Sequence, residues 1–181
     1  MDQPIAIALA STVRFSDGAV IDTLQTVEDL RTWLRLHAER LPSPRLRAGG
    51  GRLDELRSLR DATRRLFTAA VAEDSAEVGD VHLVNRLSQS VPNYLQLVWP
   101  KGGSPKAMPP PPDDRSVVPL ATLAADVVKV ITGAYGDLRG CEGPSCVLFF
   151  VRTHPRQEWC SAACGNRARV ARHYRRIKSS P

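Results

Sequence analysis

The chain contains 181 residues, of which 43% are apolar and 24% are charged, a mixture typical of a globular protein rather than a disordered one. No stretch reaches the ~18 uncharged apolar residues that a membrane-spanning helix needs, because Asp126 and Lys129 interrupt the best candidate, residues 118–134. The first residues lack the basic segment and cleavage site of an export signal. We therefore expect a cytoplasmic protein without disulfides and without a membrane partner.

The net charge of +6 is distributed unevenly along the chain. Residues 152–178 hold eight Lys or Arg and one acidic residue, whereas the remainder has 17 basic and 18 acidic residues. A surface that binds a polyanion should therefore lie near the C-terminus.

The N-terminal part predicts several short elements. Residues 5–9 are apolar and could form a strand or a helix. Two β-prone runs, residues 13–15 and 20–21, flank Ser16-Asp17-Gly18 and predict a hairpin. Thr26, with Asp29 three residues later, predicts the N-cap of a helix.

Two amphipathic helices should follow. The first places Leu30, Trp33, Leu34 and Leu41 on one face and is expected to end at residues 41–42, because a proline follows Leu41. His37 shares that face and is expected to pack or to cap the helix. After a basic, Gly-rich linker at residues 45–52, a long helix is predicted at residues 53–72. Its apolar stripe comprises Leu53, Leu56, Leu59, Leu66, Phe67 and Ala70, and its polar side comprises Asp54, Arg57, Asp61, Arg64 and Arg65.

The middle of the chain is less regular. Residues 74–89 slightly favour a helix, which Pro92 would end, and residues 94–99 predict a strand closed by Pro100. Residues 102–114 include four consecutive prolines and predict a loop. Residues 120–132 predict a buried helix that is entered through Pro119 and ends at Gly133.

All four cysteines lie near the C-terminus, in the pattern Cys141-x4-Cys146-x13-Cys160-x3-Cys164. Two close pairs separated by a short arm can surround one tetrahedral ion, so the spacing predicts one structural zinc site without an open position for water. The alternatives are buried free thiols or a redox pair, although the two-residue spacing of thioredoxin-type motifs is absent. His154 or His173 could also replace one cysteine ligand.

The residues around the cysteines predict the fold of this segment. Residues 142–145 are turn-forming, residues 147–151 are β-prone, and Ser161 can cap a helix whose first turn carries Cys160 and Cys164 on one side. The positive end of the helix dipole favours thiolates at that position. We therefore predict a mainly α protein with a small β element, in which a helical N-terminal domain precedes a treble-clef-like zinc finger.

The helix predicted at residues 161–178 carries most of the C-terminal charge. A helical wheel places Ala163, Val170, Tyr174 and Ile177 on one stripe, which we expect to rest on Trp159, Leu148 and Phe150. Arg172, Arg175 and Arg176 lie on the opposite side, and Arg169 lies at their edge. Together these four arginines predict a phosphate-binding face. A merely solvated charged face is the alternative, but the charges are all positive and have no acidic residue at i,i+4 spacing.

Arg167 lies beside the apolar stripe on the same wheel, away from the four arginines. We expect this side chain to act as a structural brace that bonds backbone or an acidic residue of the larger domain.

The string Trp159-Cys-Ser-Ala-Ala-Cys-Gly-Asn-Arg, together with the upstream cysteine pair, resembles the bacterial CGNR zinc-finger family over residues 138–176. That family pairs the finger with an N-terminal ABATE domain and is described as comprising candidate stress-induced transcription regulators. The resemblance implies an ABATE-like domain at residues 1–136 and the finger at residues 137–181. Points that resemble an ABATE domain are residues 9–13, Asp22, residues 29–30, residues 33–34, the helix at residues 53–72 and residues 84–85.

This sequence departs from the family pattern at three positions. Ser11 stands where the family often has Asn, and Val151 and Thr153 stand where Asp and Ser are common. The resemblance therefore does not establish a polar role for these positions in this chain.

The combined prediction is a zinc-binding regulator that contacts DNA through the basic finger helix. The main alternative is a zinc-finger module that binds protein or RNA, and a ligand-sensing N-terminal domain with an unknown small-molecule effector is a further one. An enzyme is not expected, because the four histidines are scattered and residues 49–51 lack the flanking strand and Lys-Ser/Thr of a phosphate-binding loop.

Overall fold

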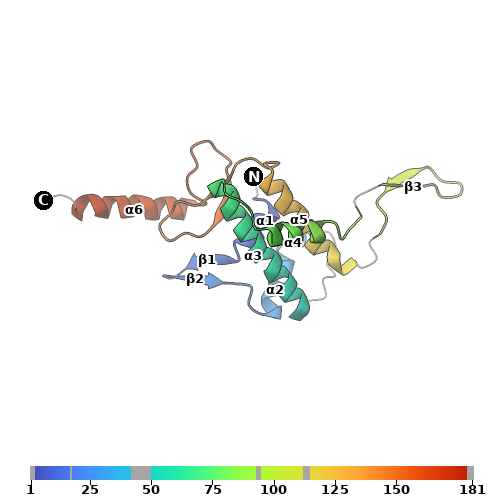
Figure 1. The fold of residues 1–181 in the computed structure, drawn as a ribbon, viewed down its shortest axis with the longest axis horizontal. Coiled ribbons are helices and arrows are strands. Elements are labelled where there is room, and N and C mark those ends of the chain that lie inside the picture. The colour runs from blue at the N-terminus through green and yellow to red at the C-terminus, as the bar shows by residue number, and fades with distance from the viewer. Residues whose placement is uncertain (1–2, 17, 42–49, 93–94, 112–114, 179–181) are drawn as a thin grey trace.

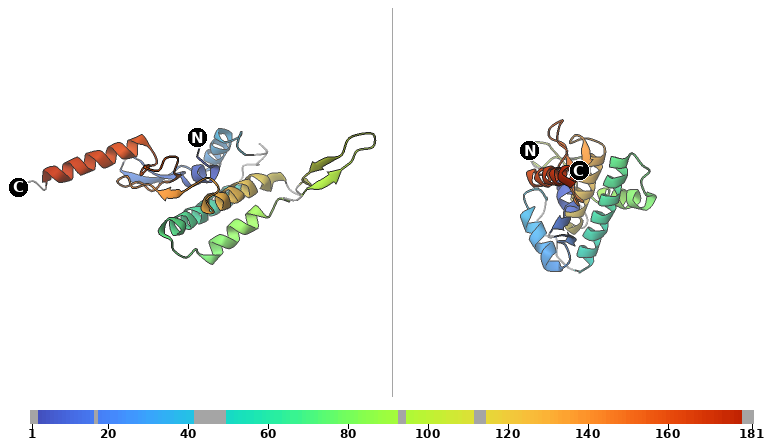
Figure 2. Two further views of the ribbon diagram at one scale, coloured as in Figure 1. Left: turned by 90° about the horizontal axis from the view of Figure 1, so that it is seen from above. Right: turned by 90° about the vertical axis from the view of Figure 1, so that its left-hand side faces the viewer.

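Figure 1 shows the computed structural model of the chain, which describes residues 3–16, 18–41, 50–92, 95–111 and 115–178. A helical body lies in the middle, and two elements project from opposite ends of it: the C-terminal helix and a two-stranded ribbon (Figures 1 and 2). No helix in the described ranges is long and apolar enough to cross a membrane. The mainly helical architecture with small antiparallel strand pairs confirms the predicted fold class.

The first element is a short helix, α1 (Ile5–Ala10), which settles the ambiguity between strand and helix. Five of its six residues are buried, so the helix has no polar face. Its sequence therefore lacks the alternation of apolar and polar residues that would indicate a helix. The predicted hairpin follows as β1 (Val13–Ser16) and β2 (Ala19–Asp22), which pair antiparallel with Ser16 opposite Ala19. Gly18 has a positive φ of 86°, the conformation that glycine permits in tight turns.

Helix α2 (Val27–Leu36) begins at the predicted cap. Thr26 and Asp29 form a reciprocal capping box, in which each side chain accepts the other residue's backbone N–H. The helix ends at Leu36, so its predicted end at residues 41–42 is wrong. His37 caps the helix and stacks on Trp33 with ring centroids 4.6 Å apart. A further turn then brings Leu41 into the core although it lies outside the helix.

Three longer helices form the body: α3 (Gly50–Ala72), α4 (Val78–Ser88) and α5 (Val118–Ile131). The predicted stripe of α3 is buried except for Ala70, which is exposed. Residues 50–52, predicted as linker, belong to α3, whereas the rest of that linker lies outside the described residues. Pro119 lies in the first turn of α5, and Gly133 has a positive φ of 78° just after its end.

The ribbon that joins α4 to α5 consists of β3 (Gln96–Val98) and β4 (Lys106–Met108), paired antiparallel. The predicted strand is present, although it is shorter than residues 94–99. The predicted loop at residues 102–114 contains β4, so that prediction is wrong for residues 106–108. The prolines lie outside β4, and a two-stranded ribbon has no central strand for them to disrupt. A 3₁₀ turn, η1 (Arg115–Val117), then leads into α5.

The finger consists of β5 (Leu138–Gly140), β6 (Phe149–Val151) and α6 (Ala162–Lys178). Its hairpin packs into the hydrophobic core of the body: Val151 is part of that core, and the ring of Phe149 lies edge-on to Phe67 of α3. The two parts of the chain therefore share apolar contacts rather than meeting through a solvated linker. The predicted domain boundary at residues 136–137 stays a prediction.

Two polar side chains of the body also bind the finger. The Gln3 amide accepts the backbone N–H of Val151 (2.7 Å) and donates to its carbonyl (3.0 Å), as a neighbouring strand would. Arg64 donates to the carbonyls of Ala10 (2.7 Å) and Val147 (2.9 Å). Arg64 was predicted to lie on the polar side of α3, but it is half-buried and joins three segments of backbone.

Buried polar groups inside the body are paired. Arg60 is 4% exposed and binds Asp22 (2.7 Å) and Asp61 (2.8 Å). Asp126 of α5 accepts the backbone N–H of Ala6 (2.9 Å) and the hydroxyl of Tyr135 (2.5 Å). Such pairing offsets the cost of removing these groups from water.

Candidate metal centre and basic helix

The four cysteine thiols lie together at the start of α6. All four sulfur atoms are within 4.8 Å of one another. Cys146 Sγ lies 3.9 Å from Cys160 Sγ and 3.8 Å from Cys164 Sγ, and the last two are 3.5 Å apart. Sulfur atoms at the corners of a tetrahedron around zinc lie roughly 3.8 Å apart, given Zn–S bonds of about 2.3 Å. The cluster therefore has the size that a four-thiolate zinc site requires.

The first cysteine pair sits on a knuckle between β5 and β6. Cys141 donates its backbone N–H to Leu148 (2.9 Å), and Cys146 donates to Gly143 (2.9 Å), which folds the pair back on itself. Gly143 lies so close to the other pair that a Cβ there would be 2.9 Å from Cys164 Cβ. The sequence identified the turn, but the need for glycine depends on a contact with a residue 21 positions away.

The second pair flanks the beginning of α6, as the spacing predicted. The Ser161 hydroxyl accepts the backbone N–H of Cys164 (3.3 Å), and Cys160 donates its own N–H to Cys141 Sγ (3.3 Å). A hydrogen bond between backbone and thiol therefore connects the two cysteine pairs even without a bound ion.

The protonation of the thiols depends on their surroundings. Burial raises the pKa of Cys146 to about 11 and also raises the pKa of Cys160. For Cys164, burial acts in the same direction, but hydrogen bonds from Ser161 and the neighbouring thiols outweigh it and lower the pKa. A divalent cation would reverse the effect of burial, because thiols that ligate a metal are deprotonated.

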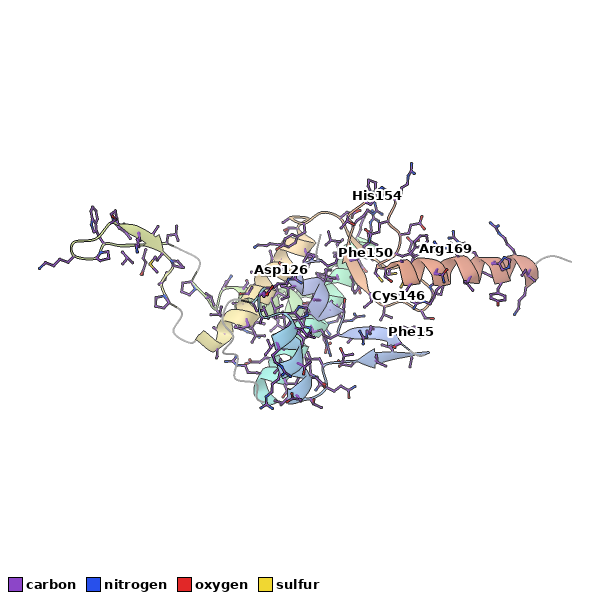
Figure 3. All side chains as sticks on the ribbon, turned by 180° about the vertical axis from the view of Figure 1, so that it is seen from behind. Phe15, Asp126, Cys146, Phe150, His154 and Arg169 are labelled. Carbon is purple, nitrogen blue, oxygen red and sulfur yellow. The ribbon has the colours of Figure 1, made fainter. Side chains whose placement is uncertain are left out.

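Thiolate ligands alone suit a closed, structural site. Within the ranges that the structure describes, the four cysteines are the only cluster of three or more potential metal ligands, and no histidine belongs to it. Figure 3 shows His154 on a loop away from Cys146, and its Nδ1 accepts the backbone N–H of Arg156. Four sulfur ligands would leave no position for a reactive water, so the centre can organise the finger rather than carry out hydrolysis.

Arg167 lies one turn after the last cysteine. It donates to Cys164 Sγ (3.1 Å), and the predicted bond to backbone or an acidic residue of the body is not seen among the described residues. A guanidinium at this distance would offset part of the negative charge of a zinc ion bound by four thiolates.

Helix α6 leaves the finger after its first turn. Only Cys164 and Gly165 are buried, and the rest of the helix projects into solvent (Figures 1 and 3). The predicted packing of the apolar stripe on Trp159 is wrong: Val170, Tyr174 and Ile177 are exposed. Trp159 packs instead against Gly165, where a Cβ would lie 2.9 Å from the ring.

The four arginines predicted to bind nucleic acid are all exposed. Arg172 lies over the Trp159 ring, 5.9 Å from its centroid, and Arg175 bonds the carbonyl of Ala171 (3.4 Å). Figure 3 shows the position of Arg169 on the projecting helix. The helix contains six Lys or Arg residues and no acidic residue, so its surface is strongly positive.

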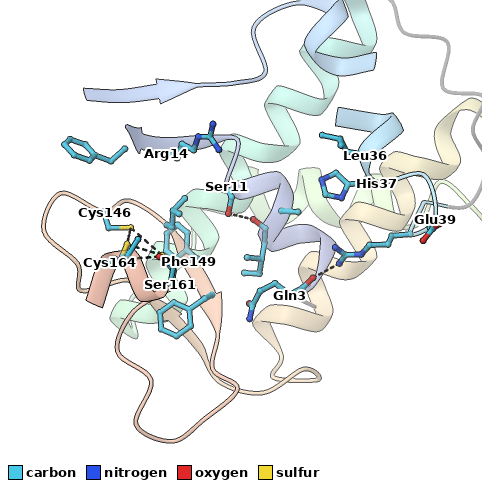
Figure 4. A pocket seen from close by; sticks show the side chains of 18 of the residues that line it. Gln3, Ser11, Arg14, Leu36, His37, Glu39, Cys146, Phe149, Ser161 and Cys164 are labelled. Carbon is cyan, nitrogen blue, oxygen red and sulfur yellow. Dashed lines mark hydrogen bonds between the residues drawn. The ribbon is translucent and has the colours of Figure 1, made fainter. Parts of the chain in front are cut away.

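A cleft of about 760 Å³ lies between the finger and the body. Figure 4 shows Ser11, Arg14 and His37 on the side of the body, opposite Phe149 and Cys164 of the finger. Burial, with a smaller effect from Arg40, lowers the pKa of His37. The metal site therefore borders α1, β1 and the end of α2, although these segments lie more than 100 residues away along the chain.

Comparison with known families agrees with this arrangement. Residues 3–134 match ABATE, described as "Putative stress-induced transcription regulator", and residues 138–177 match the CGNR zinc finger. A search of the curated proteins finds no match. Neither matched family is an enzyme family. The CGNR match and the clustered thiols are consistent with one structural zinc ion, as predicted. Because the first match covers most of the chain, the protein belongs to the ABATE family and carries a CGNR zinc finger.

Proposed function

We propose that the protein regulates transcription by binding duplex DNA through α6, with Arg169, Arg172, Arg175 and Arg176 contacting backbone phosphates. The observation that carries this proposal is a basic helix that extends into solvent and is anchored only at its first turn. Because most of the surface of this helix is exposed, the helix can enter a DNA groove without any movement of the body. The family match adds that relatives are described as transcription regulators.

The positive charge of α6 and the restricted side chain of Arg172 favour a phosphate-binding surface over a charged surface that is only solvated. Guanidinium groups can bond two phosphate oxygens at once, and each neutralised phosphate releases counterions. The stacking of Arg172 near Trp159 limits the freedom of that side chain, so less conformational entropy is lost when it binds.

Zinc would position this surface. We assign Cys141, Cys146, Cys160 and Cys164 as its ligands, with Arg167 as a brace on Cys164. A bound ion would join the β5–β6 knuckle to the first turn of α6 and thereby set the direction in which the helix leaves the body.

The test measures binding of labelled duplex DNA and of matched RNA by the zinc-loaded protein across a range of salt concentrations. We expect replacement of the four arginines by Ala to lower DNA affinity by more than tenfold. The slope of log affinity against log salt should also fall, by roughly 0.9 for each phosphate that the variant no longer neutralises.

A matched control replaces four exposed arginines of the body: Arg14, Arg31, Arg35 and Arg86. This variant changes the net charge equally and should keep most of the affinity if α6 is the binding surface. Equal loss in both variants would show nonspecific attraction, and unchanged binding in the α6 variant would exclude the proposed face. Preference for RNA, or binding to neither nucleic acid, would favour an RNA- or protein-binding module instead.

A further inference from the structure

The ribbon formed by residues 95–108, here called the arm, exposes an apolar face. Leu95, Leu97 and Trp99 alternate with polar or smaller residues, so they share one side, and Leu97 pairs with Ala107. These three side chains are 68%, 70% and 68% exposed. Soluble proteins rarely expose several large apolar side chains together unless a partner covers them.

The tip of the arm is ordered by its own contacts. Trp99 donates its indole N–H to the carbonyl of Gly103 (3.0 Å), and Gly102 and Gly103 form the turn between the strands. This bond satisfies the polar end of the Trp99 side chain and leaves the ring available for apolar contacts.

The same chain offers an apolar groove elsewhere. A cavity of about 280 Å³ lies between the end of α3, the middle of α4 and the end of α5. Its walls include Ala70, Val81, Val128 and Ile131, and Asp74 is the acidic residue at its edge. The volume is slightly below that of pockets for drug-sized ligands, so it suits one or two side chains.

The arm points away from the groove of its own chain. It begins after the end of α4 and returns at the start of α5, whereas the groove uses the middle of α4 and the end of α5. Since α5 has 14 residues, the root of the arm and the groove are separated by roughly 20 Å. Figure 2 shows the arm leading outward from this root.

We propose that two copies of the chain exchange arms, each inserting Leu97 and Trp99 into the groove of the other. Charge favours this occupant, since Lys101 and Lys106 of the arm carry the opposite sign to Asp74 at the groove. A closed exchange uses both arms and both grooves at once, which doubles the buried area relative to a single insertion.

A second copy of the chain is a better partner for the arm than DNA is. The arm carries two lysines beside its apolar face, whereas the dense positive charge of the protein lies on α6 at the opposite end (Figure 1). A dimer would present two α6 helices on one assembly, but the exchange does not depend on whether α6 binds DNA.

The test measures the mass of the full-length, zinc-loaded protein by sedimentation over a wide concentration range. We expect a concentration-dependent species of twice the 19.8 kDa chain mass. The arm variant Leu97→Ser/Trp99→Ser and the groove variant Val128→Arg should each be monomeric at concentrations where the unchanged protein is dimeric. The control Val20→Ser/Leu36→Ser removes equally exposed apolar side chains of the body and should remain dimeric.

A mixture of the arm and groove variants separates arm exchange from misfolding. One intact arm can still meet one intact groove, so the mixture should form heterodimers more weakly than the unchanged protein dimerises. A protein that is monomeric throughout, or an arm variant that dimerises normally, would overturn the proposal. If the arm variant kept the mass of the unchanged protein and lost duplex affinity instead, DNA would be the partner and the proposal would be wrong.

Discussion

Two helices of similar length, α5 and α6, lie in opposite environments. Eight of the 14 residues of α5 are buried, whereas only two of the 17 residues of α6 are, both in its first turns. Helix α5 is therefore held by apolar packing along its length, and α6 is held at one end. Isolated helices of this length are marginal in water, so the anchored end matters more for α6 than for α5.

The comparison shows how a small segment such as the finger can be stabilised although it buries few apolar side chains. The finger contributes Val151 to the core of the body, with Phe149 and Leu138 packed against that core, and its remaining organisation depends on the thiol cluster and on Trp159. A metal ion can supply the stability that a segment of this size cannot obtain from burial alone. Perturbing the metal site should thus affect α6, whereas perturbing the body should affect α5.

Removal of one zinc ligand should have the largest effect. Cys160→Ser is expected to reduce the metal content from one zinc per chain to none and to abolish most of the helical signal of α6 in circular dichroism. The reason is that apparent binding energies of structural zinc, about 10–16 kcal/mol, act as folding energy. The control His154→Ala should keep its zinc, because His154 lies outside the cluster. Full zinc content in Cys160→Ser would refute the ligand assignment.

Loss of a buried cation should destabilise the body next most strongly. Breaking a buried ion pair costs about 3–5 kcal/mol, and Asp22 and Asp61 are partly exposed, so Arg60→Ala should cost ~2–3 kcal/mol in denaturant unfolding. Its zinc content should be unchanged. Arg31→Ala, which removes an exposed pair with Glu28, should cost under ~1 kcal/mol. A similar cost for both variants would contradict the importance of burial.

Gly165→Ala should weaken the finger by a smaller amount. The added methyl would gain ~0.5–1 kcal/mol of helix propensity but clash with Trp159 at 2.9 Å, and overpacking costs about 1–3 kcal/mol. We expect a net loss of about 1 kcal/mol and weaker zinc retention against a chelator. Gly79→Ala in α4 meets nothing within 4 Å and should stabilise the protein instead. The same sign of change in both variants would disprove the proposed contact.

The smallest predicted effect concerns α5. Tyr135 donates to Asp126, and this hydrogen bond raises the pKa of Tyr135 to about 12 from 10.0. Because the folded-state pKa is the higher one, the contribution is complete below pH 10 and is lost as the pH rises toward 12. Tyr135→Phe should cost ~1 kcal/mol at neutral pH and flatten the stability profile over that interval. A profile identical to that of the unchanged protein would rule out this link.

The sequence predicted those features that depend on nearby residues. The β1–β2 hairpin, the Thr26 cap, the stripe of α3 and the cysteine spacing each depend on residues only a few positions apart in the sequence. The zinc site was predictable because four thiols have few alternative uses in this spacing.

The remaining features depend on distant partners. Arg60 and Arg64 fall among other charged residues of α3, and only the fold shows that Asp22 and Val147 come within reach of them. The need for glycine at position 165 follows from Trp159, which lies outside the helix and approaches a face that the wheel assigned to arginines. The sequence did not predict strand β4, because this segment forms a strand through its pairing with β3 rather than through its own composition.

The bond between Gln3 and Val151 has a consequence for the order of folding. During synthesis α1 is made before the finger, and the partner of Gln3 follows 148 residues later. Contacts of such long sequence separation form slowly, since closing the long intervening loop costs conformational entropy before the contact is gained. The apolar helix α1 is therefore fully packed only after the finger has been made. A chain that stops before residue 151 would leave this end of the core exposed.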